Sequence, residues 1–409
     1  MNILEMVYLY IFIYPIAMSL VWILGSNLFH HRRTPKVDIT QNVQVWPLVS
    51  ILVPCYNEEN TIEESLFALA NNPYPNKEII AINDGSKDHT SEKLSSLLNQ
   101  IPSLRVLDCK DNRGKANALI LGAHAANAEY LVCVDADAYL EDQAIFYMVA
   151  NFFHFGERLG AVTGNPRIRN RDSLLAKLQI LEYASIIGAI KRTQRIIGKV
   201  LTVSGVVVAF RKKALIDVGL WDTDMITEDI AISWKLHRRF WDIRYEPKAL
   251  CWMLVPETFN GLWKQRVRWA QGGIEVLFRH VSILFDYRYR RLWPIYIEQW
   301  TSLLWSYAWL LSTAWIILSQ TAQVEAVFWL SLNAFFLVNI SILQSFSSLK
   351  LDSEYDDVRK LFFYAPWYPF GYWIFNVFVS VAAFPKAILS RVKKGDALWT
   401  SPDRGFRKI

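Results

Sequence analysis

The sequence predicts an α/β protein in which a mostly parallel sheet flanked by helices is inserted between transmembrane helices. Four runs carry no Asp, Glu, Lys, Arg or His, and each exceeds the roughly 20 residues that a helix needs to cross a bilayer. The region between the first two runs alternates apolar and polar segments, as a soluble α/β domain does. Gly261–Phe278, rich in Trp and Arg, predicts an amphipathic interfacial helix. The apolar runs are Met6–Phe29, Gln299–Val324, Ala326–Leu349 and Leu361–Pro385.

Hydrophobic periodicity predicts the elements of the soluble domain. Apolar, β-branched runs indicate strands, and segments with helical periodicity follow them. Strands are expected at Leu48–Val53, Glu78–Ile82, Leu104–Leu107 and Tyr130–Asp135, and helices at about Thr61–Asn71, Ser91–Asn99, Gly114–Asn127 and Asp229–His237. Thr61-Ile-Glu-Glu64 predicts a capping box at the start of the first helix. Strand–helix alternation at this spacing favours parallel pairing.

These segments divide the chain into five parts. The parts are an N-terminal transmembrane helix (1–33), a cytoplasmic α/β domain (34–260), interfacial helices (261–292), a membrane region of two to three transmembrane helices (293–390) and a basic tail (391–409).

Charges beside the first apolar run predict its orientation. His30-His-Arg-Arg33 follows the run directly, and basic residues gather on the cytoplasmic side of a membrane. The run is not a signal peptide, because Glu5 precedes it and no small-residue cleavage site follows. We therefore expect the α/β domain in the cytoplasm. A fourth crossing would place the basic Ser390–Ile409 outside, so either Leu361–Pro385 bends as a re-entrant element or the tail is external, and we favour the cytoplasmic tail.

Composition and motif searches exclude several classes of protein. The four cysteines lack metal-site spacing, and Cys133, inside a predicted strand, is expected to be a small core residue. A net charge of +6 with basic residues beside apolar runs indicates anionic lipid and a diphosphate substrate, with no nucleic acid. Pro54-Cys-Tyr-Asn-Glu58 follows the first strand where a dinucleotide site would have a glycine turn, and no Walker-type loop is present.

Two aspartates follow the strand Tyr130–Asp135 at the point where it ends. Asp135 and Asp137 would lie at the carboxyl edge of the sheet, where open α/β sheets bind ligands. Two carboxylates so spaced can share one Mg²⁺ or Mn²⁺ ion, which usually keeps a diphosphate in its shell. The alternative is chance, since Asp222-x-Asp224 has the same spacing with no strand before it.

Three other positions admit a functional and a structural interpretation. Asp84, at the end of the second strand, either binds a nucleoside or forms an Asn-Asp-Gly turn. Lys115, at a helix start, either holds phosphate or is a solvated lysine. Thr227-Glu-Asp229 either supplies a general base or caps a helix with acidic first-turn residues.

A fourth position, Gln265-Arg-Val-Arg-Trp269, is either an interfacial anchor or a binding element. In the second case Arg268 would stabilise a departing diphosphate and Trp269 would stack on a sugar.

Taken together and in order, these motifs resemble the signature of the family-2, inverting, processive glycosyltransferases, which include cellulose, chitin and hyaluronan synthases. The resemblance covers nearly the whole chain and implies a GT-A-type nucleotide-sugar-binding domain. Longer strings are similar to the branch that makes poly-β-1,6-N-acetylglucosamine. They are Gly164-Asn-Pro-Arg-Ile-Arg169, Met225-Ile-Thr-Glu-Asp229, Trp263-Lys-Gln-Arg-Val-Arg-Trp-Ala-Gln-Gly-Gly273 and Ser401-Pro-Asp-Arg-Gly405.

The resemblance implies a role for each matching residue. Glu228 and Asp229 would be the catalytic acidic pair, with Asp229 as the base that deprotonates the acceptor, and Asp135 and Asp137 would bind UDP through Mg²⁺ or Mn²⁺. The remaining substrate-binding positions would be Tyr56, Glu58 and Asp84 around the uridine, Lys115 and Arg268 at the diphosphate, Gln265 and Trp269 at the acceptor, and Trp399 and Arg404 in a gating tail.

The implied activity is inverting, processive transfer of N-acetylglucosamine from UDP-GlcNAc to a growing β-1,6-linked polysaccharide. Export across a bacterial plasma membrane for a biofilm matrix would accompany it, with a small accessory membrane subunit. The alternatives are a hyaluronan- or chitin-type synthase, a lipid-directed glycosyltransferase and a non-catalytic polymer channel. A nucleotide-sugar transporter is less consistent with the large soluble domain.

Overall fold

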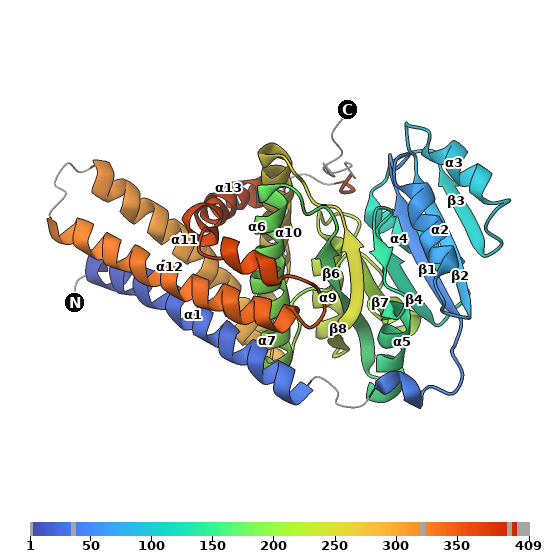
Figure 1. Ribbon diagram of the computed structural model, residues 1–409, viewed down its shortest axis with the longest axis horizontal. Coiled ribbons are helices and arrows are strands. Elements are labelled where there is room, and N and C mark those ends of the chain that lie inside the picture. The colour runs from blue at the N-terminus through green and yellow to red at the C-terminus, as the bar shows by residue number, and fades with distance from the viewer. Residues whose placement is uncertain (1–2, 34–37, 319–323, 391–394, 399–409) are drawn as a thin grey trace. The chain divides into compact units, whose positions relative to one another are not determined.

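The computed structural model describes residues 3–33, 38–318, 324–390 and 395–398 (Figure 1). The chain forms two compact units, and each is described by itself. The α/β unit comprises the described residues within 35–176, 199–280 and 390–398, and the helical unit comprises 3–33, 177–198 and the described residues within 281–389. Residues 177–198 therefore belong to the helical unit, although they lie between two segments of the α/β unit in the sequence.

The α/β unit is built on one eight-stranded sheet in the order β3-β2-β1-β4-β7-β6-β8-β5. β1, β2, β3 and β4 pair in parallel, whereas β7 runs antiparallel to its neighbours β4 and β6. β6 and β8 are parallel, and the short β5 closes the edge antiparallel to β8. The strands are β1 Val49–Cys55, β2 Lys77–Asp84, β3 Leu104–Cys109, β4 Tyr130–Val134, β5 Tyr139–Leu140, β6 Leu159–Ile168, β7 Val207–Arg211 and β8 Asp242–Met253.

Helices cover both faces of this sheet, because successive side chains of each strand point to opposite sides. In β1, Ile51 and Val53 belong to the core cluster that also holds side chains of α2, α3 and α5, whereas Leu52 belongs to the cluster that holds side chains of α4, α8 and α9. These helices are α2 Ile62–Asn71, α3 Thr90–Leu97, α5 Ala144–Phe155, α4 Lys115–Ala125, α8 Lys212–Asp217 and α9 Glu228–Arg238. A short 3₁₀ turn, Ile39–Asn42, precedes β1, and α10 (Phe259–Arg279) packs on α9.

The predicted fold class is confirmed, and the predicted elements are present with ends shifted by a few residues. Cys133 is buried in β4 as expected, and all four cysteines are free thiols. The predicted capping box is wrong: the Thr61 hydroxyl makes no cap bond and instead donates to Glu58 Oε2 at 2.8 Å. The sequence interpretation did not predict β5, β6 and β8. In this part of the sheet the regular alternation of strand and helix along the chain is lost.

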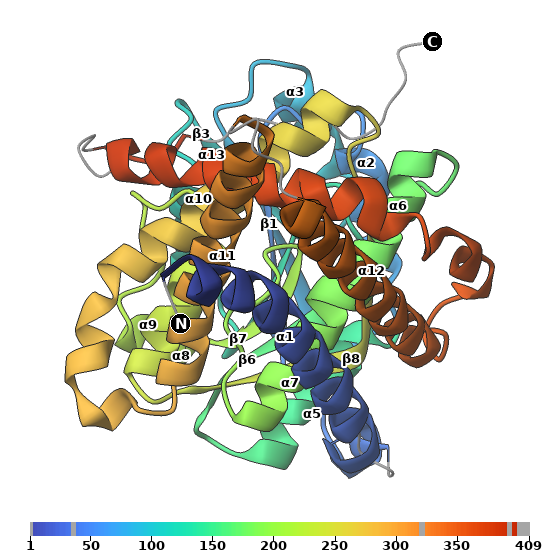
Figure 2. The same ribbon diagram turned by 90° about the vertical axis from the view of Figure 1, so that its left-hand side faces the viewer.

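The helical unit contains three helices that are long and apolar enough to cross a membrane. They are Glu5–Arg32 within α1 (Ile3–Arg33), Trp293–Leu318 (α11) and Ser331–Asp352 within α12 (Val324–Asp352). α1 packs against α7 and α12 (Figure 2). The other elements are α6 Leu174–Glu182, which begins in the α/β unit, a π-helical segment Tyr183–Gly188, α7 Ala189–Ile197, and the 3₁₀ turns Val281–Phe285 and Tyr287–Tyr289.

The fourth apolar run does not form a single long helix. A 3₁₀ segment (Arg359–Tyr364) comes first, and a π-helical segment (Pro369–Trp373) then continues directly into α13 (Ile374–Ser390). With 17 residues, α13 is not among the helices of the described residues that are long and apolar enough to cross a membrane. The re-entrant bend of Leu361–Pro385 and the side on which the tail lies stay predictions.

Polar side chains are buried inside the helical unit. Lys191, Arg192, Thr193 and Gln194 of α7 are all nearly inaccessible. Arg192 donates to Asp352 at the end of α12, with Nη2 and Oδ1 2.8 Å apart and both side chains 2% exposed. The Thr193 hydroxyl donates to the Trp22 carbonyl of α1 at 3.2 Å. α7 is therefore held between two membrane-type helices by charge and hydrogen bonding.

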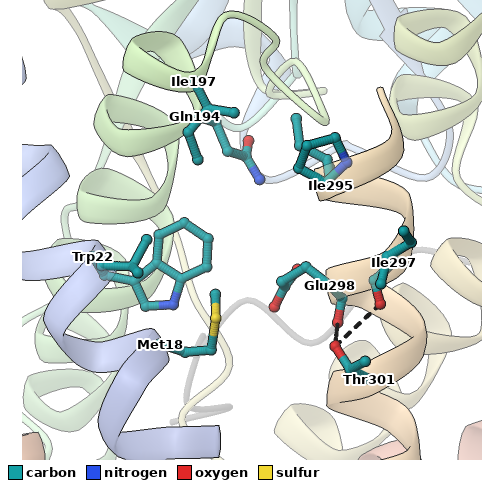
Figure 3. Close-up of a pocket in the computed structure, with 10 residues that line it drawn as sticks. Met18, Trp22, Gln194, Ile197, Ile295, Ile297, Glu298 and Thr301 are labelled. Carbon is teal, nitrogen blue, oxygen red and sulfur yellow. Dashed lines mark hydrogen bonds between the residues drawn. The ribbon is translucent and has the colours of Figure 1, made fainter. Parts of the chain in front are cut away.

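A cavity of about 310 Å³ lies among α1, α7 and α11 (Figure 3). Its wall is largely apolar, and Met18, Trp22 and Ile295 contribute to it. Among its polar groups, the Glu298 carboxylate accepts hydrogen bonds from the Tyr14 hydroxyl at 3.3 Å and from Gln299 Nε2 at 2.7 Å. None of the predicted site residues lines this cavity.

We expect Arg192→Gln to destabilise the protein strongly. Removing one member of a buried ion pair leaves an uncompensated charge, which typically costs about 3–5 kcal/mol. Arg288→Gln is the matched control, because Arg288 is 74% exposed and pairs with Asp286 at the surface. The measurement is the thermal unfolding midpoint of the full chain in detergent. Equal midpoints for both variants would contradict a stabilising role for the Arg192–Asp352 pair.

Candidate functional site

Several of the predicted site residues gather at the carboxyl edge of the sheet. β1, β2 and β4 are adjacent and parallel, so the segments that follow Cys55, Asp84 and Val134 leave the sheet at the same edge. The first residues of α4 and α9 contribute Lys115 and Glu228 to this region. A parallel sheet therefore brings together side chains that are far apart in the sequence.

Lys115 is the centre of the site. Its ammonium lies 2.6 Å from Asp135 Oδ1 and 3.2 Å from Glu228 Oε1. It also donates to the Gly205 carbonyl at 3.3 Å. Burial alone would lower the pKa of Lys115, but the attraction of Asp135 and Glu228 outweighs burial and raises the pKa above its ordinary value. Lys115 is therefore a permanent cation bridging the end of β4 and the start of α9, and not a solvated lysine.

Asp229 differs from its neighbour Glu228 in its partners. Asp229 Oδ2 accepts from the Gly205 amide at 3.2 Å, and Oδ1 accepts from the Ile230 amide at 2.9 Å. Burial, followed by repulsion from Glu228, raises the pKa of Asp229 to about 6. Glu228 carries the ion pair with Lys115, whereas the raised pKa of Asp229 suits a group that accepts a proton near neutral pH, as a general base does.

Gly205 is a site residue that the sequence interpretation missed. It lies in the segment before β7 and contacts both Lys115 and Asp229 through its backbone. A Cβ at this position would meet Asp229 Oδ2 at 3.2 Å and Lys115 Nζ at 3.4 Å, so a side chain would intrude between the two. The glycine between Ser204 and Val206, directly before an apolar strand, was the available signal.

Asp84 holds the loop that precedes Lys115. Its carboxylate is buried and accepts from the Arg113 amide at 3.0 Å and the Gly114 amide at 2.7 Å. Burial raises the pKa of Asp84, although these two amides oppose the shift. Gly114 has φ +93°, in the region that favours glycine. Asp84 thus positions the start of α4, and contact with a nucleoside stays a prediction.

Tyr56 and Glu58 lie in the segment after β1. Glu58 is buried, and its carboxylate accepts from the Thr61 hydroxyl at 2.8 Å while its amide donates to the Thr90 hydroxyl at 2.8 Å. Tyr56 is half-buried. Glu58 therefore ties the β1 exit to the start of α3, and its predicted contact with uridine is not tested by these bonds.

The two aspartates proposed for metal binding follow β4 directly. Asp135 and Asp137 are half-buried, and a turn bond from the Ala138 amide to the Asp135 carbonyl (3.0 Å) shapes the strand exit. Within the described residues, no cluster of three or more His, Cys, Asp or Glu side chains has metal-site geometry. Two accessible carboxylates fit a hard cation that takes its other ligands from a diphosphate and water.

The second Asp-x-Asp sequence has a structural role. Asp222 Oδ1 pairs with Lys235 at 2.7 Å, and Asp224 forms an ion pair with Arg279 at the surface. Asp222 and Asp224 thus link the loop before α9 to α9 and α10.

α10 carries Gln265, Arg268 and Trp269 in its first half. Arg266, which is buried, donates to Gln265 Oε1 and lies over the Trp269 ring, 4.3 Å from its centroid. From the sequence Arg266 is expected only as one of the basic residues of an interfacial helix, yet it contacts Gln265 and Trp269, the two motif side chains on either side of it. Arg268 is half-buried.

The described part of the tail lies against the α/β unit. The Ala397 amide donates to the Thr223 carbonyl at 2.8 Å. The Ala397 carbonyl oxygen occupies the space where a side chain at Gly114 would lie. Trp399 and Arg404, the predicted gating residues, lie outside the described residues.

One solved structure shares this fold across most of the chain. The mannosyltransferase PcManGT from Pyrobaculum calidifontis, in complex with GDP-Man and Mn²⁺, superposes with a TM-score of 0.63 at 18% identity, covering 94% of this chain and 99% of that chain. The α/β unit has the GT-A-like fold, with a mixed sheet flanked by helices.

Sequence comparisons extend over the whole chain. The poly-β-1,6-N-acetyl-D-glucosamine synthase of Staphylococcus epidermidis is 45% identical, with 98% of each chain covered. The synthase of the same name from Staphylococcus aureus is 46% identical, covering 97% of this chain and 98% of the relative. Residues 47–272, more than half of the chain, match the family described as glycosyltransferase like family 2. The chain is therefore a member of the family-2 glycosyltransferases.

Proposed function

We propose that this protein transfers N-acetylglucosamine from UDP-GlcNAc to the growing end of a β-1,6-linked poly-N-acetylglucosamine chain, with inversion at the anomeric carbon. The observation that carries the proposal is the Lys115–Asp135–Glu228–Asp229 cluster in a chain 45% identical to a synthase of that name over almost its full length.

Asp229 is the proposed base. Its carboxylate takes the proton of the acceptor 6-hydroxyl as that oxygen forms a bond to the anomeric carbon. The bond between the anomeric carbon and the β-phosphate oxygen breaks at the same time, and its electron pair leaves with UDP. One displacement from the far face turns an α-linked donor into a β-linkage. A positioned base of this kind typically contributes about 10²–10⁴-fold to the rate.

The donor diphosphate would lie between cationic groups. Lys115 offers an ammonium at the start of α4, next to the amides of Arg113 and Gly114, although Asp84 accepts from both amides in this structure. Arg268 would contact the departing diphosphate, and Gln265 and Trp269 the acceptor sugar. Asp135 and Asp137 would hold Mg²⁺ or Mn²⁺, which neutralises the charge that develops on the leaving diphosphate. Tyr56, Glu58 and Asp84 would surround the uridine.

The membrane part would carry the product. We propose a multi-pass protein of a bacterial plasma membrane with residues 34–260 as the cytoplasmic catalytic domain and 261–292 as interfacial helices. The region 293–390 would help to export the polymer into a biofilm matrix, together with a small accessory subunit. The tail 391–409, with Trp399 and Arg404, would lie in the cytoplasm near the donor site, which the Ala397–Thr223 bond supports. Three long apolar helices support membrane insertion.

The test is polymer formation by membranes that carry the full chain, supplied with Mg²⁺ and UDP-GlcNAc. We expect UDP release and a polymer that a β-1,6-specific hydrolase digests. UDP-glucose alone, and UDP-glucuronate with UDP-GlcNAc, are the competing donors. Turnover of a competing donor in place of UDP-GlcNAc would be consistent with the proposed mechanism but would contradict the assignment of the donor. An inactive preparation is repeated with the proposed accessory membrane subunit co-expressed before the donor is judged.

Asp229→Asn is the catalytic control in this assay. It keeps the size of the side chain and removes the base, so we expect a loss of at least about 100-fold. Asp217→Asn is the matched variant, because Asp217 is exposed at the end of α8 and its carboxylate accepts a hydrogen bond from the Trp241 ring nitrogen. Full activity in Asp229→Asn would contradict the assignment.

The rate should fall on the acid side of about pH 6. The raised pKa of Asp229, about 6, means that the carboxylate is protonated and unable to accept a proton below that pH. An aspartate with an ordinary pKa near 4 would place the acid limb about two units lower. The measurement is the initial rate of UDP release at saturating donor, taken at about ten pH values between roughly 4.5 and 8. A flat profile down to pH 5 would exclude Asp229 as the titrating base.

Removal of divalent metal should weaken donor binding as well as turnover. We expect chelation to abolish UDP release and Mg²⁺ or Mn²⁺ to restore it. Asp137→Asn should lower the affinity for Mn²⁺–UDP, measured calorimetrically, by about 10–100-fold. Asp224→Asn, in the second Asp-x-Asp sequence, should leave that affinity unchanged. Equal affinities in both variants would exclude a metal role for Asp137.

A further inference from the structure

Two adjacent glycines lie in the middle of α10, at positions 272 and 273, where the helix crosses the start of α9. Glycine destabilises a helix interior relative to alanine, so a glycine pair in a 21-residue helix calls for a reason. The two positions differ in what lies beside them. Gly272 is buried against Thr227, the residue before α9, whereas Gly273 has only Ile230 Cδ1 at 4.0 Å.

A side chain cannot be added at Gly272 without movement. A Cβ there would fall on the Thr227 hydroxyl, 2.5 Å from its Cγ2 and 2.8 Å from its Cβ. Distances under about 3 Å are not tolerated between such atoms, so α10 or Thr227 would have to shift. The Thr227 hydroxyl is buried and has no hydrogen-bond partner among the described residues, and it makes no cap bond to α9. Thr227 therefore meets α10 through close packing.

The contact between Gly272 and Thr227 lies next to the two proposed catalytic carboxylates. Gly272 touches Thr227 and Gly273 approaches Ile230, so α10 crosses the turn that contains Glu228 and Asp229. Trp269 and Arg268 precede Gly272 by three and four residues and share its helix face, about 4.5 and 6 Å along the axis. The helix that carries the motif and the turn that carries the base thus meet at one point.

We propose that Gly272 is a positioning residue, which sets the distance between Asp229 and the Arg268–Trp269 pair by allowing α10 to contact Thr227. The inference rests on the proposed function of Asp229 as the base. A base and an acceptor platform on different helices react only when their separation is fixed. A misplacement of about 1 Å can cost on the order of 100-fold in rate.

The test compares Gly272→Ala with Gly273→Ala in membranes carrying the full chain. Both changes replace a helical glycine by alanine, so both favour the helix equally. We expect Gly272→Ala to lower kcat by about 10- to 100-fold with little change in KM for the donor, and Gly273→Ala to stay within about 2-fold of wild type. The affinity for Mn²⁺–UDP should be the same in both variants, which a general folding defect of the α/β unit would not allow. The unfolding midpoint of Gly272→Ala should be somewhat lower than that of Gly273→Ala, because only the first change overpacks a contact.

A second substitution tests the contact itself. Thr227→Ala removes the hydroxyl and Cγ2, so it relieves most of the clash. Thr227→Ala combined with Gly272→Ala should recover at least about 5-fold of the rate lost in Gly272→Ala, which is the sign of coupling between touching residues. Equal rates in the two glycine variants, or no recovery in the double variant, would overturn the proposal. Failure of both Gly272→Ala and the double variant to accumulate would also overturn it, in favour of a folding role.

The outcome is separable from that of the proposed function. If the wild-type chain turns over a donor other than UDP-GlcNAc, the substrate assignment fails and the glycine comparison is made with that donor. If Asp229→Asn retains full activity, the base assignment fails, and the positioning role fails with it. If Asp229→Asn is inactive and Gly272→Ala matches Gly273→Ala, the positioning role alone fails.

Discussion

The site depends on the ion pairs of the Lys115 ammonium, whose side chain is 16% exposed. The ammonium connects the exit of β4, through Asp135, with the start of α9, through Glu228, and it reaches the loop before β7 through the Gly205 carbonyl. Taking charges out of water is costly unless they are closely paired, and here one cation is shared by the carboxylates of Asp135 and Glu228. The loop that presents Lys115 is itself held by the buried carboxylate of Asp84. Four segments separated in the sequence are thereby fixed around one atom.

This arrangement makes the two acidic residues of α9 unequal. Glu228 lies 3.2 Å from Lys115, whereas the carboxylate of Asp229 accepts from the amides of Gly205 and Ile230. Burial, followed by repulsion from Glu228, raises the pKa of Asp229 to about 6. Lys115 thus pairs with one carboxylate of α9 and leaves the other to backbone amides, which supports the proposal of Asp229 as the base.

The residue types of the site could be predicted from the sequence, but their connections could not. Asp135 was recognisable because it follows an apolar run that predicts a buried strand. Lys115 was recognisable because it stands at the predicted start of a helix. Gly205 was not recognisable, because its contact with Lys115 joins two residues 90 positions apart. It also lies just before β7, a strand that is antiparallel to both of its neighbours. The capping box failed for a local reason, since Glu58, three residues before Thr61, accepts the hydrogen bond of the Thr61 hydroxyl. At Gly205, by contrast, partners from distant segments decide what the residue does, and a local pattern only identifies a candidate.

The helical unit follows the same physical rule. Its apolar runs were evident from length and composition, but α7, with the sequence Ala-Ile-Lys-Arg-Thr-Gln-Arg-Ile-Ile, has the composition of a solvated helix. It is buried because Asp352, 160 residues further along, supplies the counter-charge for Arg192, and because α1 supplies a carbonyl for Thr193. An apolar partner would have left that guanidinium unpaired at a cost of several kcal/mol. In both units a cation shielded from water is paired with a carboxylate that is distant in the sequence. A hydrophobic pattern alone does not predict which carboxylate that is.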